Sequence, residues 1–411
     1  MMMAITDVFR QLLRDLKSQK LRTTLTTFGI LWGTVAVSLL LAFGQGLHQQ
    51  LIRSIAGLGD RIVIAFPART SIPYAGLGRG RKVQISEEDI AAVEKEARDL
   101  FGISGEYYQN LKIHQGDKTM MMLVSGISPI FGEMRNMVPQ VDGRFVNQND
   151  MDKRRRVIFL GDKIAQDIFD VENPVGRTLM IADSPFLVIG VLKTKSQDSS
   201  YNSQDKDCGW IPSTTYRAIT GAKYVDNLIY RASTPAGNKS LTKEVTAILG
   251  RRLHFDPKDS EALMVWDTTE MFEFMDAFML GFQLFLGIVG SLTLIVGGIG
   301  ISNIMNVVVE ERTREIGIKM ALGARSGYVM KQFLLETLLL TGLGGAIGLL
   351  ITQSICVLVT KLSLTEYIGV PEVSLEVAIL TATILGAVGL LAGFFPARDA
   401  SHLDPVVAMK L

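Results

Sequence analysis

The sequence is poor in the residues from which enzymes and metalloproteins usually build their sites. Only two cysteines occur among the 411 residues, Cys208 in a polar segment and Cys356 inside an apolar run. A pair between them is not expected, so no disulfide framework indicates a compartment. The four histidines are scattered and match no spacing typical of a metal or catalytic site. We therefore expect no catalytic residue and no metal site in this chain.

A phosphate-binding motif is also missing. P-loops follow the pattern G-x-x-x-x-G-K-[ST], whose backbone and lysine hold the phosphates, and no Gly-Lys dipeptide occurs anywhere in the sequence. We therefore expect that the chain binds no cofactor and is not itself an ATPase. The formal net charge is only +1, so a large basic surface for nucleic acid is not expected either. No small-residue cleavage pattern follows the first apolar run, and a cleavable signal peptide is not predicted.

Apolar residues are abundant instead and make up 48% of the chain. Long uncharged runs predict four membrane-spanning helices, within residues 23–59, 267–309, 332–361 and 373–396. The 33 residues between Asp276 and Glu310 have no formal charge, which is enough to cross a hydrocarbon core of about 30 Å. A continuous helix from Thr268 to Val309 would reach roughly 60 Å. The first part of this helix is therefore predicted to stand outside the bilayer as a stalk, and the first span is predicted to continue in the same way.

Glycines mark places where these helices are predicted to pack closely. Gly344 and Gly348 form a small-xxx-small pattern, and Gly297 and Gly298 lie in the glycine-rich part of the second span. Glu336 lies one turn inside the third run. An interfacial carboxylate with a basic partner is the expected role of Glu336, and a proton relay is the alternative.

Residues 60–266 have the mixed pattern of an α+β domain. The segment from Ser86 to Asp89 resembles a capping box that begins a helix, which is predicted to end near Leu100. A second helix is predicted over residues 239–249. The predicted strands cover residues 61–66, 120–124, 156–160, 186–192, 227–231 and 262–266. Two segments rich in small polar residues, 69–82 and 195–207, are predicted to be mobile loops.

Residues 1–22 are predicted to form a basic amphipathic helix, because apolar residues recur at intervals of three and four. It would lie along the inner membrane surface, and contact with a partner protein is the alternative. Five basic residues lie in this segment, five lie in residues 310–331 and two lie in the tail, residues 397–411, whereas only Lys361 borders the loop at 362–372. Both termini are therefore expected in the cytoplasm, and the large domain is expected outside.

The segment after the second span has the spacing of a short amphipathic helix. Ile316 and Met320 lie four residues apart and share one face. Gly323 follows, where a helix C-cap commonly lies. The polar remainder consists of Glu311, Arg312, Arg314, Glu315 and Lys319. On these residues alone, a solvated loop and a helix that docks into a cytoplasmic partner are both open.

The string ERTREIGIKMALGA, which begins at Glu311, resembles the coupling segment of MacB-like and FtsX-like ABC permeases. The strings RVIFLGDKIAQDIF, NPVGRTLMI and PFLVIGVL resemble the extracytoplasmic core domain of this family, and PARDASHLDPVVAMKL resembles its C-terminal signature. The fold implied is an α-helical four-span bundle plus a two-lobed extracytoplasmic α+β domain. The sequence ends would form one lobe and residues of about 107–224 the other.

This resemblance also implies a function in the bacterial inner membrane. Residues 310–331 would contact a separate ATPase subunit, which binds ATP and Mg²⁺, through the polar residues named above and through Ile316 and Met320. Two permeases, identical or related, would work together in the lipid bilayer. ATP hydrolysis would move the coupling helix, the stalks and the outer domain, and so export a peptide, toxin, drug or similar substrate. A periplasmic adaptor and an outer-membrane channel are further partners of such systems. The alternatives are Lol-type lipoprotein extraction and FtsX-type regulation of a cell-wall hydrolase.

Overall fold

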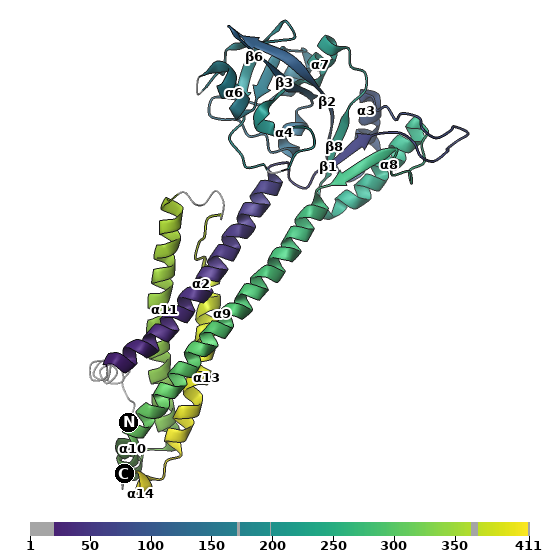
Figure 1. The fold of residues 1–411 in the computed structure, drawn as a ribbon. Helices are drawn as coiled ribbons and strands as arrows, with labels where there is room; N and C mark the ends of the chain where they lie inside the picture. The colour runs from purple at the N-terminus through teal and green to yellow at the C-terminus, as the bar shows by residue number, and fades with distance from the viewer. Residues whose placement is uncertain (1–19, 171–172, 198, 363–368, 410–411) are drawn as a thin grey trace. The chain divides into compact units, whose positions relative to one another are not determined.

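The computed structural model describes residues 20–170, 173–197, 199–362 and 369–409. The amphipathic helix predicted over residues 1–22 lies almost entirely outside these ranges. The chain divides into a helical unit, residues 1–50 with 276–411, and an outer unit, residues 51–275 (Figure 1). Helices α2 and α9 each begin in one of these units and end in the other.

The helical unit contains the four helices that the uncharged runs predicted. They are α2 (Lys20–Ala56), α9 (Thr269–Glu311), α11 (Ser326–Lys361) and α13 (Leu375–Ser401). Each is long and apolar enough to cross a membrane. Helix α11 begins before the uncharged run does, and α13 continues through Pro396. Two short helices, α10 (Thr313–Ala321) and α14 (Pro405–Ala408), also lie in the described part of this unit.

Two glycines of α9, Gly297 and Gly298, lie where neighbouring helices approach. A Cβ atom on Gly297 would lie 3.1 Å from the carbonyl oxygen of Gly29 in α2. A Cβ atom on Gly298 would lie 2.7 Å from Cγ1 of Val388 in α13. Side chains at these two positions would push the helices apart, because helix interfaces in membranes depend on close van der Waals packing.

Helix α11 packs on α2 in the same way. A Cβ atom on Gly348 would lie 2.8 Å from Cβ of Thr34 and 3.2 Å from the carbonyl oxygen of Leu31. Gly344 is also buried. The Thr34 hydroxyl donates to the carbonyl oxygen of Ile30 at 2.8 Å, so the side chain opposite Gly348 is held in place.

The outer unit is built on a nine-stranded sheet (Figure 1). Its strands are β1 (Val63–Pro67), β2 (Leu100–Gln115), β3 (Lys118–Ile127), β4 (Val157–Leu160), β5 (Thr178–Ile181), β6 (Ser184–Val191), β7 (Cys208–Pro212), β8 (Asn227–Ala232) and β9 (Leu263–Asp267). Its α-helices are α3 (Glu87–Glu96), α4 (Ile130–Met134), α5 (Gln148–Asp152), α6 (Asp162–Phe169), α7 (Ser213–Thr220) and α8 (Asn238–Leu253). The mixture confirms the predicted α+β class.

Strand β2 is shared between two groups of strands. Its first half, to Glu106, pairs with β8, which leads on to β1 and β9. Its second half, from Tyr107, pairs with β3 and β5. The pairings from β3 through β7, β4, β6 and β5 back to β2 close a ring. The outer unit therefore has two lobes. The end lobe contains β1, β8, β9 and the first half of β2, and the middle lobe contains the second half of β2 and the strands of the ring.

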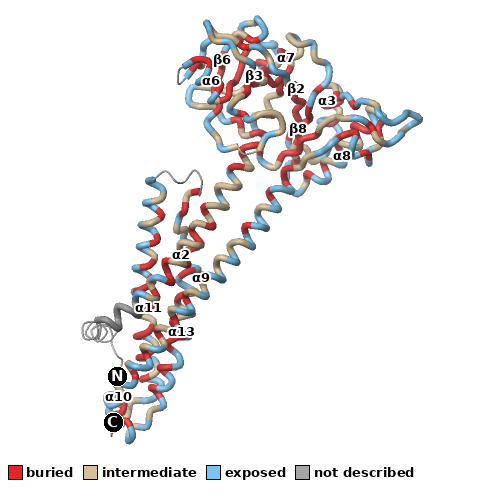
Figure 2. The backbone as a smooth tube through the Cα atoms, viewed as in Figure 1, coloured by how far each residue is buried: buried red, intermediate tan, exposed pale blue. Residues whose placement is uncertain are grey.

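Alternation along the strands gives the sheet an apolar core on each face. In β1, Val63 and Ala65 belong to one buried cluster and Ile64 belongs to another. In β4, Ile158 and Phe159 divide between the clusters in the same way. Figure 2 shows the buried residues gathered along the strands of this unit. The period of two in strands explains why neighbouring residues enter opposite cores.

The structure corrects the end of the first predicted helix of this domain. Helix α3 ends at Glu96, and Leu100 already begins β2, the longest strand. Sequence reasoning missed β2 because Gly102 and Gly105 suggest a break. A Cβ atom on Gly102 would lie 2.5 Å from Cγ1 of Ile130, so packing against α4 requires a glycine in the strand.

The close approach of α11 to α2 predicts that Gly348→Ala destabilises the helical unit by about 1–3 kcal/mol, since overpacking a tight contact has a cost of this order. Thermal unfolding in detergent measures the effect. Gly342→Ala is the matched control, because no neighbouring atom lies within 4 Å of its Cβ position. Equal stability of the two variants would show that the α2–α11 contact is looser than described.

Candidate functional site

Helices α2 and α9 are both anchored in the outer unit by side-chain hydrogen bonds. At the end of α2, the Asn136 side chain donates to the carbonyl oxygen of Ala56 at 3.1 Å, and the hydroxyls of Ser54 and Ser196 lie 3.1 Å apart. Gly57 follows, where the Ser196 carbonyl leaves no space for a side chain. The end of α2 is thus held by segments of the middle lobe.

The start of α9 is held by different elements. Thr268, just before the helix, donates its hydroxyl to the carbonyl oxygen of Ile62 at 2.8 Å. The Asn238 amide of α8 donates to Thr269 Oγ1 and to the carbonyl oxygen of Arg61, each at 2.8 Å. These partners belong to the end lobe. The two helices therefore connect to different lobes of the outer unit.

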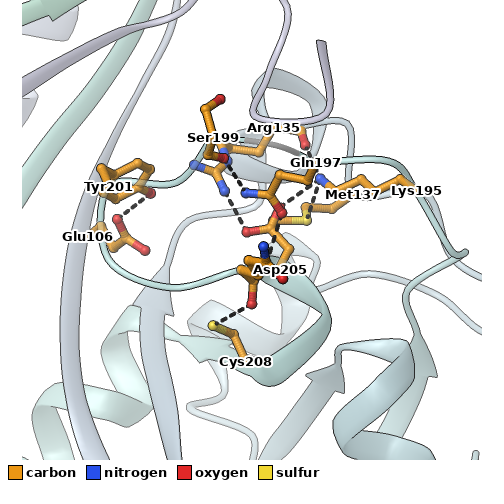
Figure 3. Close-up of polar contacts among 10 residues, drawn as sticks. Glu106, Arg135, Met137, Lys195, Gln197, Ser199, Tyr201, Asp205 and Cys208 are labelled. Carbon is orange, nitrogen blue, oxygen red and sulfur yellow. Dashed lines mark hydrogen bonds and ion pairs between the residues drawn. The ribbon is translucent and has the colours of Figure 1, made fainter. Parts of the chain in front are cut away.

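A buried group of charges lies beside the α2 anchor (Figure 3). Arg135, 2% exposed, pairs with Asp205 at 2.6 Å, and the Lys195 ammonium lies 2.7 Å from the other carboxylate oxygen. Lys195 also donates to the carbonyl oxygen of Arg135 at 3.0 Å. The Arg135 guanidinium covers the ring of Tyr201, 4.9 Å from its centre. Burial lowers the pKa of Lys195, and Asp205 opposes this change.

Glu106 of β2 completes this group. The Tyr201 hydroxyl donates to its carboxylate at 2.6 Å. Burial raises the pKa of the Glu106 carboxyl, while the charge of Arg135 opposes the rise. Burial also raises the pKa of the Tyr201 hydroxyl well above its usual value. The hydroxyl therefore stays protonated and remains a donor at neutral pH.

For residues 195–197 and 199–207, these contacts correct the prediction of a mobile loop. Three of its members, Lys195, Tyr201 and Asp205, are bonded into the outer unit through buried or half-buried groups. Its polar composition suggested a solvated loop. The sequence alone does not show that buried Arg135 and Glu106 lie close enough to bond with these side chains. The segment joins the α2 anchor to β2, the strand shared by both lobes.

The predicted coupling segment forms a separate helix. Helix α9 ends at Glu311, Arg312 leaves helical geometry, and α10 begins at Thr313. Gly323 adopts a φ of +97° and its N–H bonds to the carbonyl oxygen of Met320 at 3.0 Å. The predicted stop at Gly323 is therefore confirmed, because glycine takes this left-handed conformation without strain.

The structure changes which face of α10 is available to a partner. Ile316 is 4% exposed and belongs to the same buried cluster as Val329 and Phe333 of α11, and Met320 packs against that cluster. A Cβ atom on Gly317 would lie 2.7 Å from Cβ of Ala408, so α14 also packs on this side. The predicted docking pair, Ile316 and Met320, thus attaches α10 to its own chain.

The outward face of α10 consists of other residues. Leu322 is 84% exposed and Ile318 is 46% exposed. Arg314 is exposed on the same stripe, since positions four apart in a helix share a face. Lys319 pairs with Glu315 at 2.9 Å beside them. Sequence periodicity allowed either apolar stripe to face inward, and contacts with α11 and α14 decide between the two.

An ion pair fixes the junction between α9 and α10. Arg312 lies 3.5 Å from Glu336 of α11, and the two side chains are 16% and 10% exposed. The predicted basic partner of Glu336 is thereby confirmed. The junction residue is tied to a second long helix, so α10 is oriented by α11 as well as by α14.

Two family profiles match the chain. The profile described as MacB-like periplasmic core domain matches residues 23–248, more than half of the chain, and the profile described as FtsX-like permease C-terminal matches residues 287–405. The chain belongs to the MacB-like family. The first match contains the α2 anchor and the buried charges, and the second contains α10, the α9–α10 junction and the start of α14.

Curated MacB-like relatives align with almost the whole chain. A protein named "Macrolide export ATP-binding/permease protein MacB" from Syntrophobacter fumaroxidans is 28% identical over 98% of this chain and 64% of its own length. The protein of the same name from Chlorobaculum tepidum is 30% identical over 97% of this chain and 60% of its own. The chain thus spans about three fifths of these relatives.

Among solved structures, the periplasmic region of MacB from Actinobacillus actinomycetemcomitans is similar to this MacB-like chain. The identity is 19%, the TM-score is 0.43, and the match covers 56% of this chain and 98% of the other.

The buried charges predict that Asp205→Asn strongly destabilises the protein, because the substitution leaves both Arg135 and Lys195 without their carboxylate partner. We expect the free energy of unfolding to fall by about 3–5 kcal/mol. Denaturant unfolding followed by tryptophan fluorescence measures it. Asp207→Asn is the matched control, since its ion pair with Lys163 is exposed and contributes about 0–1 kcal/mol. Equal losses in both variants would contradict the structural role of Asp205.

Proposed function

We propose that this chain is the permease part of an ABC transporter that works by mechanotransmission. An ATP-binding subunit binds at α10, and its ATP-driven closure moves the outer unit through α2 and α9. The observation that supports this most directly is the continuity of α9. The helix begins beside Thr268, which is bonded to Ile62 just before β1, and only Arg312 separates its end from α10.

A helix with these attachments is suited to transmit movement. All 43 residues of α9 form one hydrogen-bonded rod, about 1.5 Å long per residue. At one end, Asn238 and Ile62 hold its start to the end lobe. At the other end, Arg312 follows directly and pairs with Glu336. Because α2 is held by the middle lobe, relative movement of the two helices would change the angle between the lobes.

The ATP-binding subunit is proposed to contact the outward face of α10, with Ile318 and Leu322 as apolar contacts and Arg314, Glu315 and Lys319 around them. Relatives of this chain are named ATP-binding/permease proteins, and the distribution of basic residues favours α10 and both termini in the cytoplasm. A dimer of permeases and export of a substrate from the outer side are parts of the same proposal.

A specific observation supports lipoprotein extraction as a second candidate. The helical unit has an apolar groove of about 450 Å³ formed by α2, α9 and α13. Seven of its ten lining residues are aliphatic, among them Leu41, Leu284, Ile288 and Leu380. An acyl chain would fit such a lining, because the groove offers it contacts similar to those of lipid.

The proposed contact surface on the outward face of α10 predicts that Leu322→Asp leaves the permease folded and prevents binding of its ATPase. A carboxylate at the centre of a protein interface would lose its hydration without a partner. We expect at least tenfold less ABC ATPase to co-purify with the tagged permease from native membranes, measured by mass spectrometry.

Two further variants make this test specific. Leu362→Asp changes another exposed leucine, 61% exposed, at the end of α11, and normal co-purification is expected. Ile316→Asp places a charge in the buried cluster and should reduce the amount of folded permease instead. Undiminished ATPase with Leu322→Asp would contradict the proposed surface.

The transmission role predicts that Phe274→Pro uncouples the outer unit. An interior proline removes a backbone hydrogen bond, kinks the helix and costs about 3 kcal/mol or more. ATP hydrolysis by the assembled complex should continue, but ATP should no longer change hydrogen exchange in residues 60–266. Phe274→Ala keeps the helix and should behave as the unchanged protein. A normal ATP response in the proline variant would show that α9 is not the transmitting rod.

A further inference from the structure

The outer unit has a groove of about 850 Å³ between its two lobes. One wall comes from α3 and the first half of β2, and the other comes from α4 and residues 137–148. Apolar side chains form much of the lining, including Ile90, Ile103, Ile130, Met137, Phe145 and Val146. The volume lies within the range of about 300–1,000 Å³ typical of ligand pockets, which commonly occur where two domains meet.

The charged residues that line this groove all have the same sign. They are Glu87 and Glu94 of α3 and Glu133 of α4, and no Lys, Arg or His lines it. Within the described ranges, none of the three carboxylates forms an ion pair. Tyr107 donates a hydrogen bond to Glu87 at 3.0 Å. The groove is therefore complementary to a ligand with positive charges on an apolar body.

The spacing along α3 specifies this ligand further. Glu87, Ile90 and Glu94 are three and then four residues apart, so they form one stripe of the helix, with an apolar residue between two carboxylates. Seven residues of helix correspond to about 10 Å along the axis. In a polyproline II segment, which rises about 3.1 Å per residue with three residues per turn, two side chains three positions apart lie on one face about 9 Å apart.

We propose that this groove binds a polypeptide segment in the polyproline II conformation, with two basic residues three positions apart and apolar residues between them. The two cations lie against Glu87 and Glu94, the aliphatic parts of their side chains lie against Ile90, and Glu133 adds to the attraction from the opposite wall. Binding in the groove engages both lobes at once. Binding requires neither ATP nor the helical unit. A failure of the proposed transport role would therefore not disprove this site.

Fluorescence anisotropy on the full-length protein in non-ionic detergent tests the site. The probe is the labelled peptide GSKLAKSG, which has lysines three positions apart. The unchanged protein should bind it at least tenfold more tightly than GSELAESG, in which both charges are reversed. Affinity should also fall as salt increases, because exposed charge pairs are screened.

Variants of the wall residues locate the binding. Glu94→Gln and Glu133→Gln should each weaken binding of GSKLAKSG about two- to fivefold, as expected for exposed ion pairs, and the double variant should weaken it more. Glu88→Gln is the matched control, since Glu88 is an exposed carboxylate on the same helix that does not line the groove. Circular dichroism verifies that every variant is folded.

Four outcomes of the peptide and variant measurements would overturn the assignment. They are no binding of GSKLAKSG at millimolar concentration, equal binding of GSELAESG, unchanged affinity in the double variant, and equal weakening by Glu88→Gln. Competition by spermidine as strong as that by unlabelled GSKLAKSG would also overturn it, because a free polyamine would then be the occupant.

Discussion

Helix α9 is one unbroken helix of 43 residues, and the proposed transmission of movement depends on this continuity. No proline interrupts its 43 residues, and three of its glycines, Gly290, Gly297 and Gly298, lie where another helix approaches. Its apolar composition suits a helix that crosses a membrane, and its unbroken helical backbone is what the proposed transmission requires. At both ends the rod is fixed by side chains rather than by backbone alone, through Thr268 and Thr269 at its start and Arg312 after its end.

The anchors differ in chemistry. The start of α9 is held by neutral hydrogen bonds from Thr268 and Asn238, whereas the segment that receives α2 is held by buried charges. Burying Arg135, Lys195 and Asp205 costs desolvation energy, which their mutual contacts must offset. Such a group tolerates few alternative arrangements, since removing one partner leaves another charge unsatisfied. The charges therefore give a polar connecting segment a defined position beside the α2 anchor.

Helix α10 shows how packing selects one of two possible surfaces. Its sequence has two apolar stripes, Ile316 with Met320 and Ile318 with Leu322. The absence of a side chain at Gly317 lets α14 approach, and Val329 and Phe333 surround Ile316. The stripe that remains outside is the one that a partner can contact. The identity of that surface depends on residues nearly 90 positions away, at the C-terminal end of the described chain.

The sequence by itself determined the features that depend on local composition and period. Uncharged length fixed the four long helices, Gly323 fixed the end of α10, and alternation fixed most strands of the outer unit. The tertiary structure alone decided the rest. Strand β2 exists despite Gly102 and Gly105 because α4 and its neighbours pack against it, and residues 195–207 are held because Arg135 and Glu106 are buried beside them. Both results depend on contacts between residues far apart in the chain, and no local pattern encodes such contacts.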